Sequence, residues 1–118
     1  MLLFIFIIGV NFLPSKVYCS KKIVLFGDSL MSGYGLEEEF HLSTILEKRL
    51  KLKKFNVKVI NASVSGDTTF GGLNRLNWLL TGKDIDTVVL CLGANDMLRG
   101  TKPSLVRQNL SKILEILA

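Results

Sequence analysis

A serine at the end of a predicted strand is the residue of this chain best placed to do chemistry. Residues 23–26 are four consecutive apolar residues, two of them β-branched, which is typical of a strand buried on both faces of a parallel sheet. Gly27 interrupts this run, and Ser29 then lies at the carboxyl edge of the sheet, where open α/β folds bind ligands. A serine hydroxyl at its free pKa is a weak nucleophile and needs a base. The chain contains a single histidine, His41, so the chemistry open to Ser29 depends on the groups that assist it.

Three polar turns that contain glycine follow the apolar runs of the chain. They occupy residues 27–34, 61–68 and 93–96. One such turn would mean little, because strand-to-helix loops are commonly built from Gly, Asn, Asp and Ser. Three of them at one edge of a parallel sheet converge in space and indicate a site. Glycine N–H groups and asparagine amides are suitable donors for the oxyanion that a hydroxyl nucleophile generates.

The residues around these turns predict alternating strands and helices. The order β-α-β-α-β-α implies right-handed crossovers, and hence a parallel sheet with helices on both faces. We therefore predict an α/β chain that forms the N-terminal portion of a flavodoxin-like three-layer α/β/α sandwich and ends where a fourth strand would begin. The predicted strands cover 23–26, 57–60 and 87–92, and the predicted helices cover 40–52, 70–80 and 103–117.

Local features refine these elements. The strand over 87–92 is apolar throughout, which predicts a central position in the sheet. Asp67, Thr68 and Thr69 are alternative caps for the second helix, because each has a side-chain oxygen that can accept from a helix N–H. Pro103 suits the first turn of the third helix.

The N-terminus predicts a targeting segment. Leu2–Val10 is apolar except for one glycine and is too short for a membrane span, which needs about 20 apolar residues. It matches the hydrophobic region of a signal peptide over residues 1–19, with cleavage before Ser20. An uncleaved membrane anchor is the alternative. We therefore expect a periplasmic or secreted protein whose only lasting membrane contact would be such an anchor.

Composition is typical of a single globular domain. The 118 residues are 48% hydrophobic and 21% charged, with a net charge of +5. The densest basic segment, residues 48–54, has leucines between its charges and predicts a solvated helix end, so no nucleic-acid partner is expected. After cleavage Cys91 is the remaining cysteine, which excludes a disulfide framework and predicts a buried structural thiol. Trp78 lies among leucines of the second helix, which favours a core or helix-packing role.

The three turns together resemble the SGNH hydrolase superfamily, also called GDSL esterases and lipases. The chain is most similar to the branch of periplasmic multifunctional thioesterases/lysophospholipases and arylesterases. The resemblance covers residues 23–117, and three ordered blocks are far more specific than one alone. The blocks are GDSL at 27–30 followed by SGY, NASVSGDT at 61–68 followed by GGLNRL, and LGAND at 92–96 followed by LRG.

This resemblance implies a role for each block. Ser29 matches the family's nucleophile, which forms an acyl-enzyme, and its backbone N–H would be one oxyanion donor. Gly66 would donate its backbone N–H and Asn95 its side-chain amide to the same oxyanion. The implied substrates are small acyl esters, thioesters or lysophospholipids, and no metal or organic cofactor is implied. Residues 20–118 would then be the N-terminal part of an SGNH hydrolase domain.

The sequence departs from the family in one respect. The family's general base is a histidine in a late Asp-x-x-His block, and these 118 residues contain no such block. His41 matches no family position and is predicted to be an ordinary surface or helix-start residue. Without the base, only the residual catalysis of the oxyanion hole and of binding is expected. We therefore interpret the chain as an inactive fragment of a hydrolase.

Two other functions are compatible with parts of the sequence. Asp28, Asp67 and Asp96 each follow a predicted strand, and three carboxylates at one sheet edge could hold Mg²⁺ for phosphoryl transfer or in a receiver-like domain. The ordinary use of such aspartates is a turn or cap hydrogen bond. A non-enzymatic remnant is the third interpretation, and the absent base is its main support.

Overall fold

The computed structural model describes residues 20–81 and 84–118. The predicted signal peptide lies outside these residues. Among the residues described, no helix combines the length and the apolar character needed to cross a membrane. The elements in chain order are β1 (Lys21–Gly27), α1 (Ser29–Ser32), the 3₁₀ turn η1 (Glu38–Phe40), α2 (Leu42–Leu52), β2 (Val57–Asn61), α3 (Thr69–Leu80), β3 (Thr87–Cys91), α4 (Ala94–Leu98) and α5 (Pro103–Leu117).

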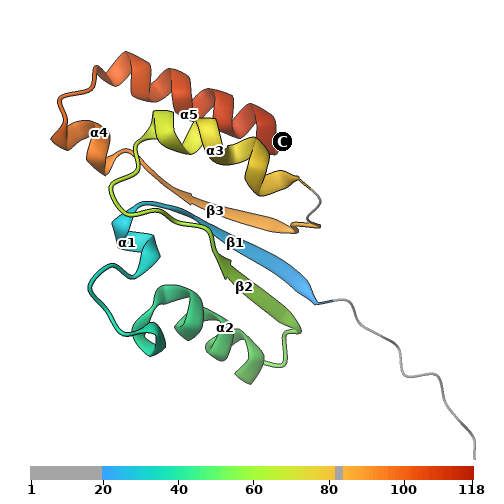
Figure 1. Cartoon of the computed structure of the whole chain (residues 1–118). Helices are drawn as coiled ribbons and strands as arrows, with labels where there is room; N and C mark the ends of the chain where they lie inside the picture. The colour runs from blue at the N-terminus through green and yellow to red at the C-terminus, as the bar shows by residue number, and fades with distance from the viewer. Residues whose placement is uncertain (1–19, 82–83) are drawn as a thin grey trace, which may run out of the picture.

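A parallel sheet with helices on both faces forms the centre of the structure, as predicted (Figure 1). The strand order is β2-β1-β3, so β1 is central and β3 pairs, within the described residues, with β1 alone. Among the described residues, therefore, β1 and not the third strand is central, contrary to the prediction. An apolar run reports that the two faces of a strand are covered, whereas its position across the sheet depends on which strands pair with it. Val89 of β3 is 39% exposed, whereas three consecutive residues of β1, Val24 to Phe26, are fully buried.

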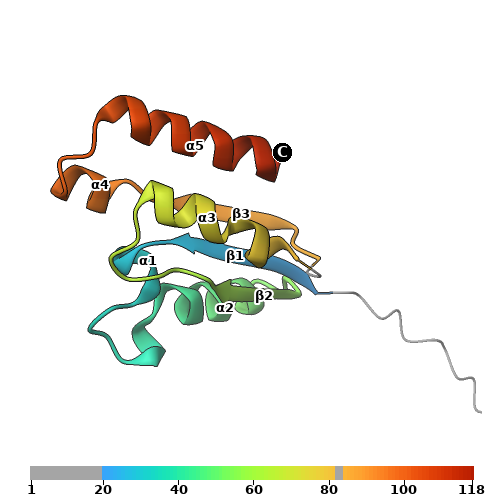
Figure 2. The same ribbon diagram turned by 45° about the horizontal axis from the view of Figure 1, so that its top comes forward.

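Alternate residues of β1 form the core on the two faces of the sheet. Val24 and Phe26 pack on one face against Leu76 of α3 and Ile113 of α5. Leu25 faces the opposite side, where the side chains from α2 join it. Figures 1 and 2 both show α3 and α5 on one side of the sheet and α2 on the other. Full burial of one such side chain contributes about 1.5–3 kcal/mol, so this central strand carries much of the stability of the chain.

The helix ends follow the local sequence. Thr68 is the cap of α3, because its hydroxyl accepts a hydrogen bond from the Gly71 N–H at 3.2 Å. Pro103 is the first residue of α5, as predicted. The first long helix begins at Leu42 and not at residue 40, because residues 38–40 form the separate turn η1. Its basic end is exposed over residues 48–54 apart from one half-buried leucine, which confirms a solvated helix end.

Two side chains differ from their predicted burial. Trp78 is 74% exposed, because it lies two residues after the buried Leu76 and therefore points to the opposite side of α3. The buried face of α3 is formed by leucines that neighbour Trp78 in sequence, and Trp78 is not part of that face. Cys91 is a free thiol and is half-buried at the end of β3, not fully buried.

The outer edge of β2 is covered by a carboxylate. The Val59 N–H points away from β1 and donates to Glu47 Oε2 of α2 at 2.8 Å. The other carboxylate oxygen of Glu47 pairs with Lys51 one helical turn later. The hydrogen bond from Lys51, followed by that from the Val59 N–H, holds the pKa of Glu47 below its ordinary value of 4.5.

The stability of the fold should therefore depend on the charge of Glu47. A carboxyl whose pKa is lowered in the folded state stabilises the fold above its unfolded-state pKa, and the stabilisation is lost as pH falls through the folded-state value. Glu47→Gln should reduce the free energy of unfolding at pH 7, and the difference from wild type should shrink below pH 4.5. Urea denaturation at a series of pH values measures this difference. An equal difference at pH 7 and pH 3 would contradict the assignment.

Candidate active site

Ser29 is the first residue of α1, and Asp28 alone separates it from the last residue of β1. The short helix begins there because Asp28 caps it, with its Oδ1 accepting from the Leu30 N–H at 3.0 Å. Asp28 is 1% exposed, so the strand end and the start of the helix are fixed by a buried side chain. Ser29 itself is half-buried and lies at the carboxyl edge of the sheet, as predicted.

The second turn extends the pairing of β1 and β2 beyond the end of β2. The Ala62 N–H donates to Leu25 O at 2.9 Å, and the Val64 N–H donates to Gly27 O at 3.0 Å. The chain then reverses at Gly66, whose φ of +80° lies in the left-handed region that favours glycine. The backbone that carries the predicted oxyanion donor is thus attached to the strand that carries Ser29.

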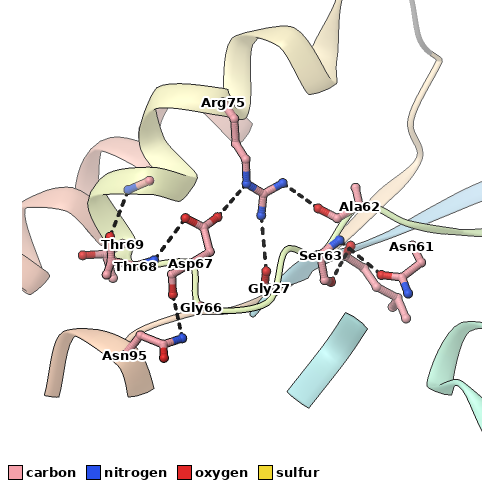
Figure 3. Close-up of polar contacts among 12 residues, drawn as sticks. Gly27, Asn61, Ala62, Ser63, Gly66, Asp67, Thr68, Thr69, Arg75 and Asn95 are labelled. Carbon is pink, nitrogen blue, oxygen red and sulfur yellow. Dashed lines mark hydrogen bonds and ion pairs between the residues drawn. The ribbon is translucent and has the colours of Figure 1, made fainter. Parts of the chain in front are cut away.

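The third turn contacts the second through two side chains. Asn95 lies in α4, and its Nδ2 donates to Asp67 O at 2.9 Å, as Figure 3 shows. Arg99 Nη2 donates to Gly66 O at 2.8 Å. A side-chain amide carries two N–H groups, so the bond to Asp67 O leaves Asn95 a second donor for an oxyanion. The structure therefore brings Gly66 and Asn95 together, although 28 residues separate Asn95 from Asp67 in sequence.

Arg75 of α3, for which no role was predicted from the sequence, connects the first two turns. Its Nε donates to Asp67 Oδ2 at 2.6 Å, its Nη1 to Ala62 O at 2.5 Å and its Nη2 to Gly27 O at 3.3 Å (Figure 3). The guanidinium also lies 3.9 Å from the centroid of the Phe26 ring. Arg75 lies in GGLNRL, the sequence block that follows the second turn, and this position is the sequence feature that could have indicated a role at the site.

A buried hydrogen-bond network fixes the helices around the site. Asp96, which is 1% exposed, accepts from the Thr69 N–H at 2.7 Å and from the Thr69 hydroxyl at 2.8 Å. Asn109 of α5 donates to Thr69 Oγ1 at 3.1 Å. The start of α3 is thereby attached to both α4 and α5, a network that was not predicted from the sequence.

The three aspartates do not form a metal site. Asp28 caps α1, Asp67 pairs with Arg75, and Asp96 binds Thr69. Among residues 20–81 and 84–118, no group of three His, Cys, Asp or Glu side chains is arranged to hold a metal ion. The magnesium interpretation of the sequence is therefore not supported. Asp28 has the cap role that was the alternative, whereas Asp67 and Asp96 bind side chains of α3.

His41 has a structural position at the start of a helix. It is the N-cap residue of α2, and its Nε2 lies 3.0 Å from Leu36 O. Its ring packs so closely on Gly33 that a Cβ built there would meet ring atoms at 2.2 Å. This placement confirms the prediction of a helix-start residue.

Comparison with known proteins identifies the family. The sequence model of the GDSL-like Lipase/Acylhydrolase family matches residues 25–118. The chain is 43% identical over 105 residues to a protein of Vibrio mimicus named arylesterase, and the match covers 89% of the chain and 52% of that protein. It is 34% identical over 112 residues to thioesterase 1/protease 1/lysophospholipase L1 of Escherichia coli K12, with 95% and 51% covered.

Solved structures give the same result. The crystal structure of AlinE4, described as an SGNH-hydrolase family esterase, matches with a TM-score of 0.78 and 45% identity, over 83% of this chain and 53% of that one. The fold and the three turns thus define the α/β scaffold of an SGNH hydrolase. The chain belongs to the GDSL-like lipase/acylhydrolase family. It spans about half the length of these relatives.

Proposed function

We propose that this chain carries the nucleophile and the oxyanion hole of a serine hydrolase that acts on esters or thioesters. The observation that carries the proposal is the contact between the second and third turns. There, the Asn95 amide binds the backbone next to Gly66, and both lie at the end of the sheet that presents Ser29. Family membership and the names of the relatives support the same class of reaction.

The reaction follows the acyl-enzyme route. Ser29 Oγ attacks the carbonyl carbon of the substrate while a general base takes the hydroxyl proton. The Ser29 N–H, the Gly66 N–H and the Asn95 amide hold the negative oxygen that forms. Collapse of this intermediate breaks the bond to the leaving alcohol or thiol, which receives the proton from the base. Water then attacks the acyl-serine by the same steps and releases the carboxylic acid.

The general base is proposed to be a histidine outside the 118 residues. The sequence contains no Asp-x-x-His block, and His41 is engaged with Leu36 O at the start of α2. We expect the nucleotide sequence beyond the codon for Ala118 to encode an Asp-x-x-His block, in frame or after a frameshift. Sequencing of the gene tests this, and the absence of such a block would favour a non-enzymatic remnant.

The proposed substrates are small acyl esters, thioesters or lysophospholipids. The relatives named arylesterase and thioesterase 1/protease 1/lysophospholipase L1 support this range. We expect the protein to bind no nucleic acid, and to contact the membrane only transiently or through an uncleaved N-terminal segment.

Loss of the nucleophile or of one oxyanion donor should reduce hydrolysis by different amounts. In the complete gene product, Ser29→Ala should abolish hydrolysis of p-nitrophenyl butyrate, because no acyl-enzyme forms. Asn95→Ala should lower kcat about 100- to 1,000-fold, because one donor to the oxyanion is removed. Release of p-nitrophenolate measures both.

Ser111→Ala, which removes an exposed hydroxyl from α5, is the matched control and should retain wild-type kcat. Hydrolysis that survives Ser29→Ala would remove Ser29 from the mechanism. A dependence of the reaction on Mg²⁺ with a phosphate ester would overturn the ester hydrolase assignment.

We also propose that residues 1–19 are a signal peptide and that the protein acts in the periplasm or outside the cell. The short apolar run Leu2–Val10 supports this proposal. The mature protein should begin at Ser20, and the mass of the intact protein recovered from the periplasm or the medium measures this. Recovery of the uncleaved protein from the membrane fraction would favour an anchor instead.

A further inference from the structure

We propose that Arg75 is the positioning residue that fixes the oxyanion-hole turn relative to Ser29. This inference rests on the ester hydrolase function proposed above and assigns a role to a side chain that touches neither the substrate nor the reacting atoms. Its basis is geometric. One guanidinium binds the strand end that leads into Ser29, the start of the second turn, and the residue next to Gly66.

The three acceptors of Arg75 lie in the segments that lead to Ser29 and to Gly66. Gly27 O belongs to the last residue of β1, two residues before Ser29. Ala62 O lies directly after β2, and the Asp67 carboxylate directly follows Gly66. Arg75 therefore spans the two segments whose separation sets the distance between the nucleophile and the Gly66 N–H.

Backbone hydrogen bonds from β1 reach the second turn only as far as Val64. The chain reverses after that residue, and the Asp67 N–H donates to Val64 O at 3.1 Å across the reversal, not to β1. At Gly66 and Asp67 the turn is held to the third turn by Arg99 and Asn95. The ion pair of Arg75 with Asp67 attaches the same place to the side of the sheet that carries Ser29.

The guanidinium of Arg75 is suited to binding three acceptors at once. Arginine presents five N–H donors in a rigid plane, which lets one residue bind three acceptors at fixed angles. Lysine has one compact ammonium on a flexible stem and does not reproduce this geometry. The side chains of Arg75 and Asp67 are 23% and 10% exposed, so water screens their attraction only in part.

The kinetic consequence follows from when the oxyanion forms. A displaced Gly66 N–H weakens a hydrogen bond that is made in the transition state and not in the bound substrate. Such a loss lowers kcat and kcat/KM together and leaves KM nearly unchanged. A residue that only stabilised the fold would instead reduce the number of working molecules and leave the kcat of each unchanged.

Arg75→Lys in the complete gene product tests the proposal, because it keeps the positive charge on an aliphatic stem and removes the planar guanidinium that binds the three acceptors. We expect kcat for p-nitrophenyl butyrate to fall about 10- to 100-fold while KM changes by less than about twofold. The kcat is counted per active serine, which the burst of p-nitrophenolate titrates. Wild-type kcat per active serine in a folded Arg75→Lys protein would overturn the proposal, and so would a loss confined to KM.

Asp67→Asn provides a second variant that keeps the shape of the side chain. It should lower kcat in the same direction, and the double variant should lose less than the product of the two single losses, because both act through one contact. Fully multiplicative losses would also overturn the proposal. Lys21→Met is the matched control, since it removes an exposed ion pair with Asp86 at the opposite end of β1 and should leave kcat unchanged.

Two experimental results separate the positioning role of Arg75 from the proposed ester hydrolase function. If the wild-type protein shows no hydrolysis that depends on Ser29, the ester hydrolase function itself is wrong. If Ser29-dependent hydrolysis is present and Arg75→Lys retains it in full, only the positioning role of Arg75 is wrong.

Discussion

The carbonyl of Gly27 accepts two hydrogen bonds, one from the Val64 N–H and one from Arg75, and the relative position of the first two turns depends on them. Gly27 can offer this carbonyl because β1 is buried on both faces and ends in a fixed place. The polar part of the site is therefore built outward from a hydrophobic strand. Packing fixes the strand, the strand fixes one carbonyl, and that carbonyl fixes the loop opposite Ser29.

The features that sequence predicted well are those that short segments determine. An apolar run followed by Gly27 predicted both the strand and the place of Ser29, because burial and chain reversal are local properties. The helix start at Pro103 was predicted for the same reason, and the cap residue Thr68 is one of the three alternatives that the sequence offered. The short helix α1 lies within the first predicted turn and α4 begins within the third, and at four and five residues they are too short to show a helical period.

The features that sequence missed depend on contacts between distant residues. Asp28, Asp67 and Asp96 are the same residue type after three predicted strands, yet one caps a helix, one pairs with Arg75 and one binds Thr69. Their partners lie 2, 8 and 27 residues away in sequence, and only the last two partners involve a side chain. Spacing alone gives no means to separate these uses from metal ligation. Strand order likewise depends on pairing, which no single run of residues encodes.

The two outer edges of the sheet are unlike each other. At β2 the carboxylate of Glu47 already occupies the Val59 N–H, so a strand approaching from that side would have to displace a charged, hydrogen-bonded group. At β3, no described residue pairs with the outer side, and Val89 is partly exposed there. The sheet is therefore a one-sided template, on which a further strand from the same chain or from another molecule adds more readily beside β3 than beside β2. Any aggregation of this chain by strand pairing would accordingly take place at the β3 edge.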